Sequence, residues 1–357
     1  MSGAQTLSAT RETPREAAHA ASAPAIDARH MEPVAEAEAP RLLSEEVNGL
    51  PACHTLYAAG DFAVLVAQRP LIPRVMNEIG RLREISFRAA GEGTGKSRDI
   101  DAYDDWYMQL FVWHRKEQQV LGAYRLCMSD VVRPRHGEAG LYTKSLFAYD
   151  EAFLDALGPA VEMGRSFVRL ELQGAGRVLA LLWRGIAHLL AARPRYRTLF
   201  GPVSVSSMYS PASRRLVASW LCQGEHRHPL FGSVQPLRPC EPSHEVIPAE
   251  QDIKLLSRRV SQLEGDGKGL PILVKEYVKL GGRFLAFSVD PGFQDALDGF
   301  VVVDLDCTNP KLLALYMGQQ NYERFRGWQK PAPRPQPAPA AAAPRHIFGA
   351  LAPNSIE

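Results

Sequence analysis

The 357-residue chain has no marked excess of either charge, since 41 Lys and Arg face 39 Asp and Glu for a net charge of +2. Proteins that bind nucleic acids usually carry a clear basic excess, so no nucleic-acid partner is expected. The five cysteines are too few and too scattered for a disulfide framework. No window holds the ~20 apolar residues of a membrane-spanning helix, and no apolar run follows a basic start as in a secretory signal. We therefore expect a cytoplasmic protein with at most peripheral contact with the inner membrane.

Alanine and proline, in contrast, are plentiful at both ends of the chain. The first forty residues contain twelve Ala, four Pro and no aromatic residue, so they bury too little apolar surface to offset the entropy lost on ordering. Of the fourteen residues 331–344, twelve are Pro or Ala, which predicts an extended, polyproline-like tail. We expect disordered tails at 1–49 and 329–357. They would flank one domain at 50–328, whose C-terminal extension begins near residue 222.

The spacing of apolar residues predicts a mixed α/β domain. Helices are expected where apolar residues recur every three to four positions, at 72–87, 150–157, 178–192, 211–221, 251–263 and 270–280. Strands are expected at short apolar runs rich in β-branched residues, at 61–68, 107–114, 119–128, 161–172, 198–206, 283–289 and 300–305. The polar residues 115–118 predict a hairpin turn. Some strands should therefore pair directly, and others should be linked through helices.

Residues 90–97, AGEGTGKS, are similar to a phosphate-binding loop. Such a loop needs a buried strand before it and a helix after it. Here the preceding segment is amphipathic and charged. The following one carries four carboxylates that would repel a triphosphate, at Asp99, Asp101, Asp104 and Asp105. We interpret residues 90–97 as a glycine-rich loop that binds no nucleotide.

A series of arginines and acidic residues, with one phenylalanine among them, extends over about eighty residues. Its members, in chain order, are Arg83, Phe87, Asp99, Asp101, Asp104, Arg125, Glu162 and Arg165. This order resembles that of the acyl-homoserine-lactone synthases and the ornithine-lipid N-acyltransferases, which share the Gcn5-related N-acyltransferase fold. Residues 179–216 and 269–305 resemble the hemolysin-like, lipid-forming branch of that family. The similarity extends from about residue 56 to residue 320.

The resemblance implies an α/β fold with a mixed, mostly antiparallel central sheet flanked by helices. It also implies transfer of a 3-hydroxy fatty acyl group from acyl carrier protein to the α-amino group of an amino acid, with L-ornithine as the expected substrate. No permanently bound cofactor is expected. The co-substrate would be an acyl-phosphopantetheine, on acyl carrier protein or on coenzyme A. Two alternatives remain: acyl-homoserine-lactone synthesis, which would consume S-adenosylmethionine, and a non-catalytic module that binds acyl carriers or lipids.

Acylation of an amino acid requires a carboxylate that binds the ammonium group and removes its proton. Glu162, Asp101 and Asp104 are the catalytic candidates, with Glu162 as the first choice for the base. Side chains alternate along a strand, so Glu162 and Arg165 would share a cleft only if their strand is bulged. The oxyanion donor is then expected to be a backbone N–H of that strand.

The substrate carboxylate requires a guanidinium group. Arg125 or Arg165 could supply a bidentate pair. The resemblance adds Arg83 and Phe87 to the substrate-binding set. Taken one at a time, these residues also fit a plain surface ion network.

Residues 173–177, QGAGR, lie where a predicted strand meets a predicted helix. Backbone N–H groups and the helix dipole make such a junction an anion site. A plain helix-start turn is as good an interpretation of the residues alone. The resemblance favours a cradle for the pantetheine phosphate, formed by Gln173, Gly174, Gly176 and Arg177.

Two further groups of residues have side chains that could form binding sites. An arginine cluster is predicted to dock an acidic carrier protein or an anionic lipid surface, or else to be a solvated edge, at Arg193, Arg195, Arg197, Arg214 and Arg215. Cys222, His226 and His228 have no clear fourth ligand. No metal site is therefore predicted.

Overall fold

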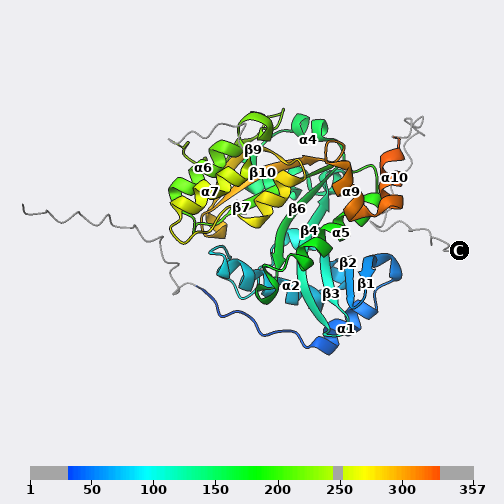
Figure 1. The fold of residues 1–357 in the computed structure, drawn as a ribbon. Coiled ribbons are helices and arrows are strands. Elements are labelled where there is room, and N and C mark those ends of the chain that lie inside the picture. Colours follow the sequence, from blue (N-terminus) through cyan, green and yellow to red (C-terminus); the bar gives the residue numbers. More distant parts are fainter. Residues whose placement is uncertain (1–30, 244–251, 330–357) are drawn as a thin grey trace, which may run out of the picture.

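The computed structural model describes residues 31–243 and 252–329. An eight-stranded sheet forms its centre, in the order β1-β2-β3-β4-β6-β7-β10-β9 (Figure 1). Its strands are β1 Thr55–Ala59, β2 Phe62–Gln68, β3 Met108–His114, β4 Gln119–Met128, β6 Ala160–Val168, β7 Thr198–Val205, β9 Arg283–Asp290 and β10 Ala296–Asp304. A second, small sheet pairs β5, Phe147–Ala148, with β8, Gln235–Pro236.

Neighbouring strands of the large sheet are antiparallel except β6 and β7, which run parallel. The predicted mixed, mostly antiparallel sheet is therefore confirmed. The hairpin predicted at residues 115–118 joins β3 to β4. The C-terminal extension adds β10 and β9 to the same sheet, because β10 pairs with β7 along its length.

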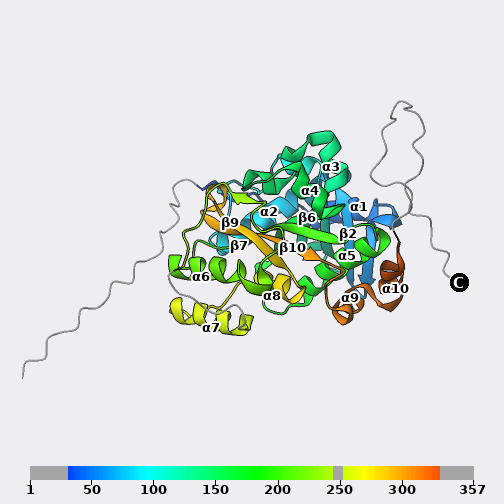
Figure 2. The same cartoon turned by 90° about the horizontal axis from the view of Figure 1, so that it is seen from above.

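Helices cover both faces of the sheet. Their bounds are α1 Pro40–Asn48, α2 Pro73–Ala89, α3 Ser129–His136, α4 Glu151–Leu157, α5 Arg177–Ala192, α6 Pro211–Leu221, α7 Ile253–Leu263, α8 Ile272–Lys279, α9 Pro310–Met317 and α10 Gln319–Gly327. Helices α5 to α10 share one apolar core, whereas α1 and α2 pack in a second core on the opposite face. Seen from above, Figure 2 shows α3 and α4 on one side of the sheet and α6, α7 and α8 on the other.

Strand β2 illustrates why the sheet has two apolar faces. Val64 and Val66 belong to the core under α5, and the alternate residues Leu65 and Ala67 belong to the core under α2. Successive side chains of a strand point to opposite faces, so a continuous apolar run suits a strand buried on both sides. The predicted strand at 61–68 is confirmed for this reason.

The predicted start of the domain near residue 50 is wrong. Helix α1 lies within the segment that was expected to be a disordered tail, and it buries Leu43 and Val47 in the core with α2. The Glu46 carboxylate accepts hydrogen bonds from the backbone N–H groups of Arg74 and Val75 at the start of α2. Residues 1–30 and 330–357 of the predicted tails lie outside the described residues.

Several elements differ from the sequence-based expectation. The strand predicted at 161–172 ends at Val168 and continues as a 3-10 turn. Strand β1 and helices α3, α9 and α10 were not predicted. In the described part of the chain, no helix is long and apolar enough to cross a membrane.

Candidate active site

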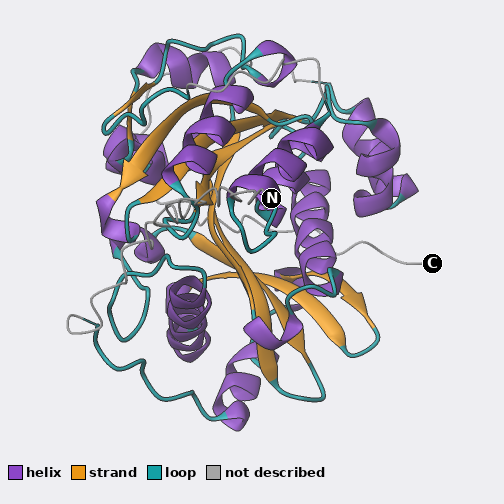
Figure 3. Cartoon of the chain, turned by 60° about the vertical axis from the view of Figure 1, so that its left-hand side comes forward, coloured by secondary structure: helices purple, strands orange, loops and turns teal. Residues whose placement is uncertain are grey.

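The site lies where the two parallel strands of the sheet separate. β6 and β7 pair over only three residues, from Ala160 with Thr198 to Glu162 with Phe200. Beyond this point Gly201 follows on β7, and a Cβ atom there would lie 2.0 Å from the carbonyl oxygen of Met163. Only glycine permits this close approach of two backbones. In Figure 3 the strands spread from the middle of the sheet into two halves.

A bulge in β6 lies next to this opening. Ala123 of β4 pairs with Phe167 and Arg125 pairs with Gly164, so two residues of β6, Arg165 and Ser166, stand opposite Tyr124. Arg165 has a φ of +49°, which is unusual for a residue with a side chain. A bulge of this kind breaks the regular alternation of side chains. A bulge was predicted as the condition for Glu162 and Arg165 to share a cleft, and β6 contains one.

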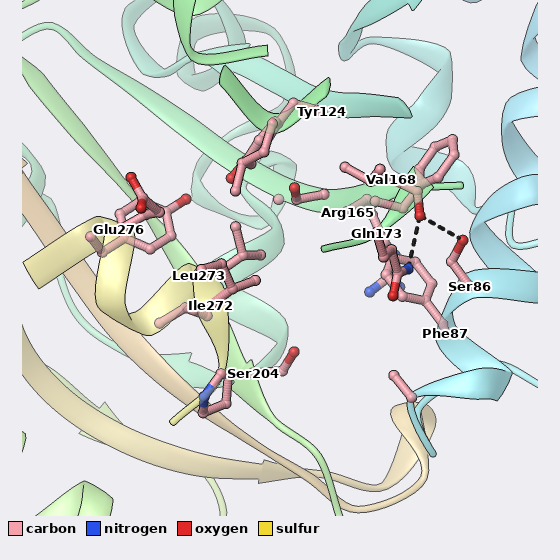
Figure 4. A pocket seen from close by; sticks show the side chains of 18 of the residues that line it. Ser86, Phe87, Tyr124, Arg165, Val168, Gln173, Ser204, Ile272, Leu273 and Glu276 are labelled. Carbon is pink, nitrogen blue, oxygen red and sulfur yellow. Dashed lines mark hydrogen bonds between the residues drawn. The ribbon is translucent and has the colours of Figure 1, made fainter. Parts of the chain in front are cut away.

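A cavity of about 630 Å³ fills the opening between β6 and β7. Its walls come from the end of α2, from β6 and β7, from the start of α5 and from α8. Figure 4 shows Arg165 and Ser204 on its strands, Phe87 on α2, and Glu276 on α8. Elements far apart in the sequence thus enclose one space, which is the usual form of a small-molecule site.

One end of the cavity is aromatic. Tyr124, Trp183, Tyr277 and Tyr316 line it, and the Trp183 ring centroid lies 5.7 Å from that of Tyr277 and 6.4 Å from that of Tyr316. One buried polar atom here, Trp183 Nε1, has no hydrogen-bond partner among the described residues, whereas the Tyr124 hydroxyl lies beside the hydroxyl groups of Ser166 and Tyr277. Buried polar groups are normally paired, so the indole N–H is suited to a polar group of a ligand.

The glycine-containing loop before α5 borders the same cavity. Gln173, Gly174 and Gly176 line it, and Gly176, with a φ of +67°, precedes the first turn of α5 without a side-chain cap. Gln173 Nε2 donates a hydrogen bond of 2.9 Å to the Val168 carbonyl, which also accepts from the Ser86 hydroxyl (Figure 4). Because no side chain caps the start of α5, its first backbone N–H groups are suited to an anion. Arg177, the fourth predicted member, is not part of the cavity lining and lies over the Phe62 ring, 4.2 Å from its centroid.

Two carboxyl groups that the sequence analysis did not single out also line the cavity. Glu92 is 7% exposed and Asp298 is 5% exposed. Burial raises the pKa of Glu92 to about 7, against the lowering effects of the Ser204 hydroxyl and Arg165. Burial, together with the nearby Asp290 and Glu92, raises the pKa of Asp298 well above its usual range. Glu92 lies in the glycine-rich loop and Asp298 within an apolar strand, so local sequence gave no sign that they meet.

Most of the predicted acidic and arginine residues form a buried network beside the cavity. Arg83 donates to Asp104 at 3.0 Å and to Gln109 at 2.6 Å. Arg125 donates to Asp101 at 2.5 Å. Arg83 and Arg125 are almost fully buried, and none of these five residues is part of the cavity lining. Burial tends to raise the pKa of Asp104, but Arg83 and Arg125 keep it far below its usual range. These hydrogen bonds and ion pairs attach the segment that precedes β3 to the sheet.

Arg165 joins that network to the cavity. Its Nε lies 3.2 Å from an Asp99 oxygen, and its Nη1 donates to the Tyr142 hydroxyl at 3.2 Å. Its guanidinium carbon also lies 4.6 Å from the centroid of the Phe293 ring. Phe87, another predicted substrate-binding residue, lines the cavity and contacts Phe293 edge to face at 4.9 Å. Of the predicted substrate-binding set, Arg165 and Phe87 therefore face the cavity.

Glu162 lies outside the cavity lining and is 1% exposed. Its Oε1 accepts from the Thr143 backbone N–H at 2.7 Å, and its Oε2 accepts from the Tyr142 N–H at 3.0 Å and from the Tyr107 hydroxyl. Burial raises the pKa of Glu162, and the hydrogen bonds from Thr143 and Tyr107 oppose this rise. Its role as the base stays a prediction, but these contacts occupy both of its oxygens.

The five arginines predicted to form one cluster are divided between the two ends of β7. Arg193, Arg195 and Arg197 precede the eight-residue strand, and Arg214 and Arg215 follow it on α6. At about 3.3 Å per residue the strand separates the two groups by about 26 Å, so the prediction of a single cluster is wrong. Within the described ranges 31–243 and 252–329, no group of three His, Cys, Asp or Glu side chains has the arrangement of a metal site.

The chain is similar to several known proteins. Residues 82–184 match the acetyltransferase (GNAT) domain. The chain is 35% identical over 253 residues to a glycine N(α)-acyltransferase of Phocaeicola vulgatus, covering 65% of this chain and 76% of that protein. It is 27% identical over 256 residues to an L-ornithine N(α)-acyltransferase of Agrobacterium fabrum, covering 69% and 80%. Among solved structures, an N-acyl amino acid synthase from uncultured soil microbes matches with a TM-score of 0.40 and 11% identity, covering 72% of this chain and all of that one.

Proposed function

Because the chain belongs to the Gcn5-related N-acyltransferase (GNAT) family and is an acyltransferase related to glycine and L-ornithine N(α)-acyltransferases, we propose that it transfers a fatty acyl group from a thioester to the α-amino group of an amino acid. The observation that carries the proposal is the composition of the cavity between β6 and β7. An aromatic end and a carboxylate-lined end belong to one continuous space. These are the environments that an acyl chain and an ammonium group require.

The phosphate of the pantetheine arm would lie at the loop 173–176. The uncapped start of α5 offers backbone N–H groups there, and the helix dipole favours an anion. From this loop the arm would extend along β6 toward the bulge at Arg165. The extra residue in the bulge has no partner on β4, so a backbone N–H there is suited to stabilise the tetrahedral oxyanion. Either acyl carrier protein or coenzyme A would present such an arm.

The acyl chain would occupy the aromatic end of the cavity. Trp183 there carries an indole N–H without a partner among the described residues. A 3-hydroxy group on the acyl chain would accept a hydrogen bond from this N–H, which supports a 3-hydroxyacyl donor over an unsubstituted one.

The amino acid would enter at the carboxylate-lined end. Glu92 and Asp298 would face its ammonium group, and Arg165 its carboxylate. L-Ornithine is the substrate predicted from the sequence, whereas the relative with 35% identity is named for glycine. Ornithine carries a second ammonium group on its side chain. This group would be attracted to the carboxyl groups of Glu92 and Asp298 and of the nearby Asp290. We therefore retain ornithine as the proposed substrate and glycine as the alternative.

The donor protein would dock where the cavity opens at α8. Ile272 is 59% exposed and lines the cavity, and the exposed Lys279 lies on the same helix. Glu276 pairs with Lys279 at 3.3 Å, so this rim would contact an acyl carrier protein mainly through its apolar side chain, with the lysine adding attraction to acidic groups. The split arginines around β7 do not provide one continuous docking face for it. We also propose that the product is a lyso-ornithine lipid and that the protein contacts the membrane peripherally.

The test is a reconstitution with purified full-length protein. Plain and 3-hydroxy acyl thioesters of acyl carrier protein and of coenzyme A would be offered with glycine, L-ornithine or no amino acid, and products identified by mass spectrometry. We expect thiol release that depends on the amino acid, together with an N-acyl amino acid. A lactone formed from S-adenosylmethionine would support the homoserine-lactone alternative. Thioester binding without any product would support a non-catalytic module.

A further inference from the structure

In the function proposed so far, the glycine-rich loop 90–97 only places Glu92 at the end of the cavity that would hold the substrate ammonium group. We propose that this loop supplies the proton acceptor of the reaction, Glu92, and that Asp298 binds the substrate ammonium group beside it. This inference rests on the proposed acyl transfer. It assigns to the loop the role that the sequence analysis gave to Glu162.

The loop has a fixed shape that directs Glu92 inward. Gly91 and Gly93 on either side of it have φ angles of +73° and +121°, which L side chains rarely adopt. The Glu92 backbone N–H donates to the Phe87 carbonyl at 2.7 Å, at the end of α2. The buried Glu84 carboxylate accepts from Thr94 and from the Gly95 N–H at 2.8 Å. Glu92 is thus anchored on both sides in the sequence.

The same loop is tied across the opening to the far strand. The Ser206 hydroxyl at the end of β7 donates to the Ala90 carbonyl, and the Ser207 hydroxyl donates to the Gly91 carbonyl at 3.2 Å. These bonds keep Glu92 next to Ser204 on β7. Since a catalytic group must be held in place by its supporting contacts, this fixed position favours a direct role in the reaction.

Charged and titratable groups surround the Glu92 carboxyl group in the cavity. The titratable and charged groups that act on it are Arg165 of β6, Asp298 of β10 and Tyr209 before α6. Asp298 is more than nine-tenths buried and lines the cavity. Burial raises the pKa of this carboxyl, and an ammonium group beside it would favour the ionised carboxylate, so its position in the cavity suits a cationic ligand. The pKa of Glu92, about 7, suits proton transfer near neutral pH.

The proposed step is balanced in atoms and charge. The substrate ammonium gives one proton to the Glu92 carboxylate, and the freed amine forms a C–N bond with the thioester carbonyl carbon. The tetrahedral intermediate breaks its C–S bond, and the thiolate takes the second nitrogen proton to leave as a thiol. Protonated Glu92 then releases its proton to water, and the amide retains one N–H.

The main test compares the Glu92→Gln variant with wild type in the reconstituted assay. We expect kcat to fall by about 10²- to 10⁴-fold, the usual effect of losing a general base. In wild type, kcat/KM should rise with pH through about 7 as Glu92 ionises, and the variant should lack this rise. Glu323→Gln, at an exposed position on α10, is the matched control and should behave as wild type. A Glu92→Gln enzyme with near-normal kcat and an intact pH rise would overturn the inference.

Asp298→Asn tests the second residue separately. Because this carboxyl would bind the ammonium group and not accept its proton, the variant should raise KM for the amino acid at least tenfold and lower kcat less. KM for the acyl donor should remain unchanged. An equal effect on both KM values would contradict the assignment of Asp298.

Thermal unfolding provides a readout that does not depend on activity. The pKa of Glu92 is raised in the folded state, so the folded protein holds a proton between pH 4.5 and 7 that the unfolded chain releases, and Glu92 lowers stability as pH rises through that window. The unfolding temperature of Glu92→Gln relative to wild type should therefore increase from pH 5 to pH 8. If wild type forms no N-acyl amino acid, the proposed function fails. If it does and Glu92→Gln matches it, only this inference fails.

Discussion

At the scale of single residues, the environment decides what a buried carboxyl group can do. Glu92 and Glu162 are both almost fully buried, and burial raises the pKa of each. Glu162 accepts hydrogen bonds on both oxygens from Thr143, Tyr142 and Tyr107, whereas Glu92 borders an open cavity. The first arrangement fits a structural role and the second a role in proton transfer.

This difference predicts that Glu162→Gln acts mainly on stability. A glutamine would turn an NH₂ group toward one of the two backbone N–H donors and leave that donor unpaired. We expect the free energy of unfolding to fall by about 1–3 kcal/mol, with kcat within a few-fold of wild type. Chemical denaturation and steady-state kinetics would measure both. Loss of activity with unchanged stability would instead identify Glu162 as the base.

At the scale of elements, the separation of β6 from β7 creates the site. The sequence predicted both strands, but it could not reveal that they pair over only three residues. The close approach of Gly201 to the Met163 carbonyl lies at the point where pairing ends. The bulge at Arg165 lies opposite Tyr124 of β4, so its position depends on a neighbouring strand as well as on β6.

Gly201→Ala tests the importance of this point. The added Cβ would lie 2.0 Å from a backbone oxygen, so β6 and β7 must move apart. We expect a loss of about 1–3 kcal/mol in stability, as for other overpacked sites, and reduced acyl transfer. Gly164→Ala on β6 is the control for stability, because a Cβ there has no neighbour within 4 Å. Equal unfolding temperatures for the two variants would contradict the prediction.

At the scale of the whole molecule, the N-terminal segment belongs to the domain. Leu43 and Val47 of α1 are buried against α2, and Glu46 accepts hydrogen bonds from the first turn of that helix. The sequence did not predict this helix, because α1 directly follows the Ala- and Pro-rich segment and only two of its side chains, Leu43 and Val47, are buried. The predicted boundary at residue 50 therefore removes part of the structure.

A truncation tests this boundary. A chain that starts at residue 50 should be less stable than one that starts at residue 31. Burial of a Leu or Val contributes roughly 1.5–3 kcal/mol each, so the unfolding temperature should fall by about 10 °C. Leu43→Ala with Val47→Ala in the longer chain should reproduce most of this loss. Identical unfolding curves for the two lengths would show that α1 contributes nothing to stability.

The sequence by itself determined the elements whose signals are local: the amphipathic helices α2 and α5, the β3–β4 hairpin and the glycine loop before α5. Apolar spacing and turn residues specify such elements within a few turns of chain. The sequence also placed Arg165, Phe87, Gln173, Gly174 and Gly176 among the site residues, and these five line the cavity.

Only the tertiary structure decided which charged groups meet in the cavity. Glu92, Arg165 and Asp298 lie on three elements, the loop after α2, β6 and β10, and are brought together by the order of strands in the sheet. Arg125 and Glu162 do not line the cavity, because they bind partners distant in sequence, Asp101 and Tyr107. Charge and residue type are local properties, whereas solvent access and pairing depend on contacts between distant segments, and those contacts decide the chemistry of each group.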